Sequence, residues 1–282
     1  MPRKAYDTDL TDEEWEICDK ILKATLSKRG RKPLMSHRET LDAVFYRTRA
    51  GCQWRNLPHD FPPWERIYAT YHRWVEEGIW KKLHDALCQE VRKKNNREAT
   101  PSVLIIDSQS VKADAIAEEK GYDANKKIKG IKRQTVTDTL GLVVDVMVHS
   151  AAISDRDGAK LLLLRLRDEN RLPRLEKIFA DGGYSGHLIE WVAVETGWSL
   201  EIVKRDNPHE FVVLPKRWVV ERTFGWLMFW RVLNRHHERK VETGECVVRI
   251  AMIHNMLRLL TRKEEPKKPK KRWKTVKTRK VA

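Results

Sequence analysis

Two short apolar runs that each end in an aspartate decide the fold of this chain: VLIID (residues 103–107) and LEKIFAD (residues 175–181). Branched and aromatic side chains crowd both runs, which is typical of buried strands. A carboxylate at the carboxyl end of a buried strand is costly unless it is paired or holds a metal. We therefore expect Asp107 and Asp181 to be paired or to bind a metal ion.

Strands and helices alternate around these two runs. The patterns predict further strands at residues 142–148 and 200–203, and helices at residues 155–170, 187–195, 216–233 and 245–260. Gly182 and Gly183 follow the second aspartate and would let backbone or substrate approach it closely. This succession predicts an α/β fold with a mixed sheet.

The chain before residue 95 has a helical pattern instead. Thr11 with Glu14, and Ser36 with Glu39, form capping-box signatures ahead of apolar residues at helical spacing. Helices at residues 64–77 and 79–91 follow a break at residues 51–63. Such a segment resembles a helix-turn-helix DNA reader, although the break is longer than the usual turn. The candidate DNA contacts are Arg47, Arg49, Arg55, Arg66 and Arg73.

The composition favours a polyanionic partner. The 282 residues carry 56 Lys and Arg against 40 Asp and Glu, a net charge of +16. Nucleic acid is the leading partner, and a membrane surface is less favoured. The longest nearly apolar run, residues 140–148, is too short to span a bilayer, and no signal-peptide pattern opens the chain. Four scattered cysteines support neither a zinc site nor a disulfide framework, so we expect a protein of the reducing cytoplasm.

Half of the net charge lies in the last twenty residues. Residues 263–282 hold ten Lys or Arg and two Glu, a charge of +8, with Trp273 as the single large apolar residue. This composition predicts a disordered tail. The tail either only keeps the chain in solution or forms a nonspecific phosphate-binding arm.

A second basic segment lies between the expected strands. Its cations are Lys126, Lys127, Lys129, Lys132 and Arg133. A lysine-rich loop beside a catalytic strand would bind phosphates. An ordinary exposed hairpin is the alternative interpretation.

Glu221 is the third candidate acid and is expected in the middle of a helix, one turn after Arg217. Phosphodiester chemistry on DNA uses two Mg²⁺ ions flanked by carboxylates. Asp107, Asp181 and Glu221 would supply such a set, with Mn²⁺ as a substitute ion. On spacing alone, the alternative remains that both aspartates cap loops and that Glu221 pairs with Arg217.

Six motifs stand in order along the chain: DSQSVK (107–112), GYDANKKIKGIKR (121–133), DTLGLV (138–143), DRDGAK (155–160), FADGGYSG (179–186) and RWVVERTFGWL (217–227). Together they closely resemble the DDE transposases of the Insertion Sequence Five family, within the Insertion Sequence Four superfamily of bacterial insertion-sequence transposases, and the resemblance implies a bacterial, nucleoid-associated protein. The resemblance extends from about residue 10 to residue 260. It implies a ribonuclease H-like catalytic core and assigns the catalytic triad to Asp107, Asp181 and Glu221.

The wider superfamily often surrounds its Glu with a Tyr seven residues before, an Arg four before and a Lys seven after. Here those positions hold Leu214, Arg217 and Met228, so only the Arg is kept. The phosphate contacts of the Tyr and Lys are therefore absent or taken over by Arg222, Lys216 and the segment 126–133.

The sequence thus predicts a DNA transposase that binds the terminal inverted repeats of an insertion sequence, cuts at the ends and joins the 3′-OH to target DNA. We expect a helical DNA-binding domain at 1–98, a ribonuclease H-like domain at 99–262 and the tail at 263–282. Handling two DNA ends implies at least a homodimer. The rival functions are a DNA-binding repressor, a catalytically silent domesticated transposase and a structure-specific nuclease.

Overall fold

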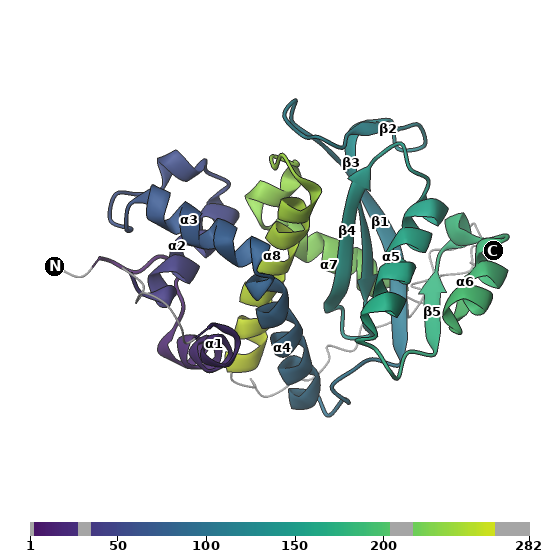
Figure 1. The fold of residues 1–282 in the computed structure, drawn as a ribbon, viewed down its shortest axis with the longest axis horizontal. Coiled ribbons are helices and arrows are strands. Elements are labelled where there is room, and N and C mark those ends of the chain that lie inside the picture. Colours follow the sequence, from purple (N-terminus) through teal and green to yellow (C-terminus); the bar gives the residue numbers. More distant parts are fainter. Residues whose placement is uncertain (1–2, 28–34, 204–216, 263–282) are drawn as a thin grey trace, which may run out of the picture.

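The computed structural model describes residues 3–27, 35–203 and 217–262 (Figure 1). The amino-terminal part is helical, as expected. Both capping boxes are present, because the Thr11 and Ser36 side chains accept from the first turn and Glu14 and Glu39 reach back. The elements are α1 (Asp12–Thr25), α2 (His37–Ala50), the short 3-10 helix η1 (Trp54–Asn56), α3 (Trp64–Glu76) and α4 (Ile79–Lys94).

A six-stranded mixed sheet follows. Its strands are β1 (Val103–Lys112), β2 (Gly121–Asp123), β3 (Ile128–Thr137), β4 (Val143–Ser150), β5 (Lys177–Ala180) and β6 (Ser199–Ile202). The main order is β4-β3-β1-β5-β6, and β2 pairs with the start of β3. The pairs of β3 with β1 and β4 are antiparallel, whereas β1, β5 and β6 run parallel. The mixed α/β architecture agrees with a ribonuclease H-like core.

Helices cover both faces of the sheet (Figure 1). Side chains alternate along a strand, so Leu104 and Ile106 pack with α5 (Asp155–Glu169) and α6 (Leu188–Thr196). Ile105 faces the other way and packs on α7 (Arg217–Met228). The remaining elements are the 3-10 helices η2 (Gly182–Tyr184) and η3 (Arg231–Asn234), and the long helix α8 (Val241–Thr261).

Helix α8 joins the amino-terminal helices to the sheet (Figure 1). One continuous hydrophobic core contains Phe45 of α2, Trp80 of α4, Val146 of β4 and Ile253 of α8. His254 lies edge-on to the rings of Phe45 and Trp230. The segment after the proposed boundary at residue 98 is therefore packed firmly against the segment before it.

The structure differs from the sequence patterns at two places. Residues 128–137 form the central strand β3, which the patterns did not predict. The helix expected at 216–233 ends at Met228, and η3 follows.

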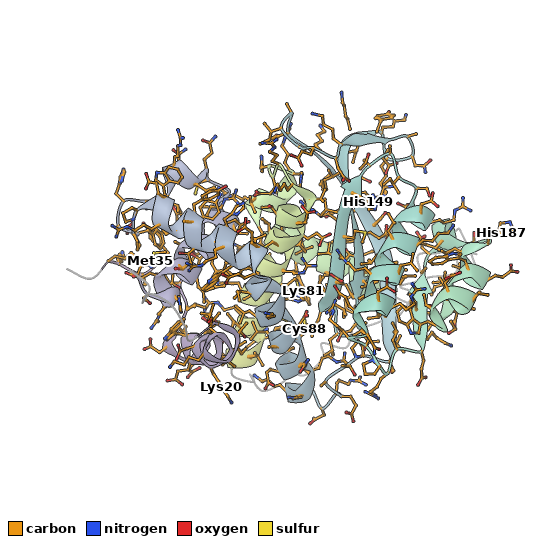
Figure 2. All side chains as sticks on the ribbon, viewed as in Figure 1. Lys20, Met35, Lys81, Cys88, His149 and His187 are labelled. Carbon is orange, nitrogen blue, oxygen red and sulfur yellow. The ribbon has the colours of Figure 1, made fainter. Side chains whose placement is uncertain are left out.

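The four cysteines are free, in agreement with the absence of a disulfide pattern. Cys88 and Lys81 lie on α4 (Figure 2), and the Lys81 ammonium contacts the Glu169 carboxylate of α5 at 2.5 Å. Among the helices of the described residues, none combines the length and apolar character needed to cross a bilayer.

A buried ionic cluster fixes β4 to the helices on either side. The Asp145 carboxylate is fully buried and contacts Arg249 of α8 at 2.7 Å, Arg165 of α5 at 3.0 Å and Arg171 at 3.1 Å. Burial alone would raise the pKa of Asp145, but the three guanidinium groups outweigh it and lower this pKa to about 2. The charges stabilise the junction only while all of them remain paired.

Replacing Asp145 by asparagine should lower the free energy of unfolding at pH 7 by about 3 kcal/mol, because the buried Arg249 and the partly exposed Arg165 and Arg171 lose the fully buried carboxylate that they share. The folded pKa lies below the unfolded one, so the contribution of Asp145 is complete above about pH 4 and is lost as the pH falls through about 2. Urea unfolding at pH 7 and near pH 3 tests this, and the difference from wild type should shrink at the lower pH. Asp168→Asn, on the exposed surface of α5, is the control and should change little. A difference independent of pH would contradict this account of the cluster.

Candidate active site

Strand register aligns the two aspartates. Strands β1 and β5 pair in parallel with Val103 opposite Lys177 and Ile105 opposite Phe179. Continuing this register by two residues sets Asp107 level with Asp181, on the same face as Ile105. Both aspartates line one small pocket, whose other lining residues are apolar. Sequence position alone did not predict this alignment, because it depends on which strands are neighbours.

Backbone groups orient both carboxylates. The Ser108 amide donates to Asp107 Oδ1 at 2.7 Å, and the Gly183 amide donates to Asp181 Oδ1 at 2.8 Å. A β-carbon on Gly183 would lie only 3.0 Å from that oxygen, whereas one on Gly182 would meet nothing within 4 Å. Glycine at 183 therefore permits the close turn around Asp181, and the surface at 182 is open.

Glu221 lies on α7, which covers this face of the sheet. Val219 and Val220 pack with Ile105 and Phe179, and Val220 also lines the aspartate pocket. The Glu221 side chain, one residue further on, is exposed. Within residues 3–27, 35–203 and 217–262, no group of three or more His, Cys, Asp or Glu side chains is arranged to hold a metal ion. The structure thus brings the two aspartates together and leaves Glu221 on the adjoining helix.

A polar network supports β1 from the opposite face. The Ser108 hydroxyl donates to Asp155 Oδ1 at 2.7 Å, and the Lys132 ammonium contacts the same oxygen at 2.8 Å. Lys132 also reaches Asp123 at 3.5 Å and is only 4% exposed. Burial would raise the pKa of Asp155, but hydrogen bonds from Lys132 and Ser108 lower it. Asp155 and Ser108 were not predicted as site residues, although both fall inside the quoted motifs DSQSVK and DRDGAK.

The basic segment is divided between surface and core. Lys126, Lys127 and Lys129 are exposed in the β2–β3 hairpin, and the Lys126 ammonium donates to the Ser108 carbonyl and hydroxyl at 3.1 Å. Lys132 and Arg133 belong instead to β3 and are buried. Arg133 donates to the Leu233 carbonyl at 2.8 Å, and burial lowers its pKa to about 10. The expectation of a five-cation loop is corrected, because Lys132 and Arg133 are buried in a strand and are not exposed to phosphates.

The arginines of the helical part also differ in their surroundings. Arg47 is buried, contacts Glu238 at 3.1 Å and lies over the Trp54 ring at 4.8 Å, so it is not on the surface where DNA would bind. Arg49 is half-buried over the rings of Phe229 and Trp230. The three exposed members of the set are Arg55, Arg66 and Arg73.

Of the cations expected near Glu221, only Arg222 is described with its side chain. Its guanidinium lies over the rings of Trp218 and Trp226, at 4.4 and 4.6 Å, and donates to the Leu140 carbonyl at 2.7 Å. Lys216, the Arg217 side chain and the tail 263–282 lie outside the described residues.

Comparison with known proteins identifies two family models along the chain. A model described as "Transposase DDE domain" matches residues 98–256, which is more than half of the 282 residues. A model described as "Putative transposase of IS4/5 family" matches residues 10–84. The first match includes the aligned aspartates and α7, and the second covers most of the helical part.

Three curated proteins are similar over shorter stretches. An uncharacterised protein of Sinorhizobium fredii, y4sN, is 33% identical over 105 residues, which are 37% of this chain and 76% of that protein. A 16.2 kDa protein of insertion element IS402 from Burkholderia cepacia is 23% identical over 121 residues, 40% of this chain and 78% of its own. A "Putative transposase for insertion sequence element IS402" from the same organism is 29% identical over 118 residues, 40% of this chain and 56% of its own. No solved structure matches the chain.

Because the basic segment 126–133 is divided between surface and core, replacing a buried lysine should lower the free energy of unfolding more than replacing an exposed one. Lys132→Met should lower the free energy of unfolding by about 3 kcal/mol, because Asp155 and Asp123 would lose a buried counter-charge. Lys129→Met, at an exposed position of the same strand, is the matched control and should stay within about 0.5 kcal/mol of wild type. Urea unfolding of both variants is the measurement. Equal stability of the two variants would show that the Lys132 contacts contribute nothing net.

Proposed function

The chain belongs to the transposase DDE-domain family, and on this premise we propose that it cuts the ends of an insertion sequence and joins them to target DNA. The observation that supports this most is the parallel register of β1 and β5, whose continuation sets Asp107 level with Asp181, together with the small pocket that both aspartates line. Two carboxylates held at one level provide oxygen ligands for a divalent cation. Acting on DNA would locate the protein with the bacterial nucleoid.

The donor set suits Mg²⁺, with Mn²⁺ as a substitute. Mg²⁺ in phosphoryl-transfer sites is commonly held by one or two carboxylates, with water and phosphate oxygens as its other ligands. Asp107 and Asp181 would hold two ions between them, and Glu221 would complete the ligands of one. Bound there, the ions would activate the attacking oxygen and stabilise the leaving oxygen of an in-line displacement.

The protein's own groups would position the reactants. The backbone hydrogen bonds at Asp107 and Asp181 hold their carboxylates before DNA arrives, which reduces reorganisation during the reaction. The hairpin lysines would hold phosphates beside the cut, and exposed arginines of the helical part would bind the inverted repeat. Water would attack first and the freed 3′-OH second. Two ends handled together would require at least a dimer.

Two other functions share part of this machinery. A repressor or a silent domesticated transposase would bind DNA without cutting it, and a structure-specific nuclease would cut without joining. A cleavage assay in Mg²⁺ distinguishes a transposase from a protein that only binds DNA. Transfer of the new 3′ end to a second plasmid distinguishes a transposase from a nuclease.

Asp107→Asn and Asp181→Asn should each reduce cleavage at least about a thousandfold, because each removes a negative oxygen ligand. Glu221→Gln should do the same if it completes the site. The assay is Mg²⁺-dependent nicking of a plasmid that carries the gene with its native flanking DNA, together with gel-shift binding, which should persist. Glu190→Gln, at an exposed position of α6, is the control. A variant that cuts like wild type would remove its residue from the proposed triad.

Deleting residues 263–282 should weaken binding to all DNA sequences alike, because the segment carries a charge of +8. The plot of log affinity against log salt concentration should become less steep, since fewer counterions are released. Titrations of inverted-repeat and unrelated duplexes at several salt concentrations test this. A loss confined to the inverted repeat would overturn the assignment of a nonspecific arm.

A further inference from the structure

A second pocket, outside the aspartate site, lies where α2, α7 and α8 meet. Its volume is about 420 Å³, within the range of small-molecule sites. Trp226 and Phe229 contribute aromatic rings, and Leu259 contributes an aliphatic side chain. Phe229 is 66% exposed, so most of its ring is accessible to a ligand. These rings are available for a ligand with a flat apolar face.

The charge of the pocket is positive. Arg49, Arg258 and Arg262 line it, and none of the lining residues among those the structure describes is acidic. Arg258 already contacts Glu14 at 3.3 Å, so its charge is partly offset. Arg49 lies over the Phe229 ring at 5.9 Å, so a cation and an exposed ring occur together. Asn255 adds an amide that both donates and accepts hydrogen bonds.

An open strip of α7 leads from Glu221 to this pocket. Glu221 and Gly225 of α7 and Phe229, the first residue after this helix, follow one another at four-residue spacing, and all three are exposed. A β-carbon at Gly225 would meet nothing within 4 Å. Trp226 is five residues beyond Glu221, about 8 Å along a helix. That is the length of roughly two or three nucleotides of a DNA strand.

We propose that the pocket formed by Arg49, Trp226 and Phe229 binds an unpaired nucleotide of the DNA strand that passes over Glu221. This nucleotide site rests on the proposed function only in the assumption that the DNA strand passes over Glu221. The base would stack on the aromatic rings, and the arginines would contact its phosphates. A paired base would not enter, because its faces are already covered by its neighbours in the duplex.

The chemistry favours DNA over a second copy of the chain. Guanidinium groups next to exposed aromatic rings match a ligand that alternates phosphates with flat bases. A second copy docking the same face in a two-fold arrangement would bring three arginines against three arginines. That charge repulsion argues against a self-interface at this pocket.

The test uses the full chain in EDTA, so that neither cleavage nor metal binding contributes. The probes are a fluorescein-labelled oligothymidylate of about twelve nucleotides and a duplex of similar length and mixed sequence. Phe229→Leu keeps an apolar side chain but removes the ring, and Phe229→Trp keeps a ring. Gly225→Glu adds a negative charge to the strip, and Gly225→Ala is its matched control. Fluorescence anisotropy gives the affinities, and thermal unfolding verifies that each variant is folded.

We expect Phe229→Leu to weaken oligothymidylate binding about tenfold and duplex binding less than twofold, because stacking serves only unpaired bases. Phe229→Trp should bind like wild type. Gly225→Glu should weaken oligothymidylate binding more than Gly225→Ala does.

Equal losses for both probes, or no loss with either, would overturn the proposal. A dimer that dissociates in Phe229→Leu, with unchanged oligothymidylate binding, would assign the pocket to a second copy of the chain. Cleavage-deficient triad variants should bind the oligothymidylate normally. Failure of the catalytic proposal and failure of the nucleotide site are therefore seen in separate assays.

Discussion

The parallel pairing of β1 with β5 is the constraint on which the site depends. It aligns Ile105 with Phe179, and the same register sets Asp107 level with Asp181. Successive side chains of β1 point to opposite faces of the sheet, so adjacent residues of this strand make different contacts. Ile105 holds α7 against one face, and Ser108 joins Asp155 and Lys132 on the other. A slip of one residue would turn Asp107 toward α5 and would bring an apolar side chain to the α7 face, so the buried contacts on both faces keep Asp107 level with Asp181.

The positive charge of the chain has two physical roles. Part of it is inside: Lys132, Arg249 and Arg47 are buried against carboxylates, and the buried Arg133 donates to a carbonyl. Breaking such a pair costs more than the pair contributes, so these side chains fix the packing and do not bind DNA. The cations available to phosphates are those left on the surface, among them the lysines of the β2–β3 hairpin and the exposed arginines of the amino-terminal helices. Net charge alone therefore overstates how much of the surface is suited to nucleic acid.

Local patterns predicted the capping boxes at Thr11 and Ser36 and the strand that begins at Val103, because these features depend on nearby residues. Strand β3 was missed because its lysine and arginine hide the apolar pattern, and their partners at Asp155 and Leu233 are distant in sequence. Arg47 was assigned to DNA for the same reason, since its partner Glu238 comes 191 residues later in the sequence. The motifs pointed to Asp107, Asp181 and Glu221, but the level alignment of the two aspartates requires the strand order. The orientation of Glu221 depends on the packing of α7 and is not visible in spacing.

Asp107 and Asp181 are proposed to bind divalent metal ions together. Electron paramagnetic resonance of Mn²⁺ added to the full chain with bound DNA tests this most directly and needs no turnover. We predict that wild type sequesters Mn²⁺, that Asp107→Asn and Asp181→Asn each lose most of this binding, and that Glu190→Gln, on exposed α6, retains it. Undiminished Mn²⁺ binding by a double Asp107→Asn, Asp181→Asn variant would contradict the account.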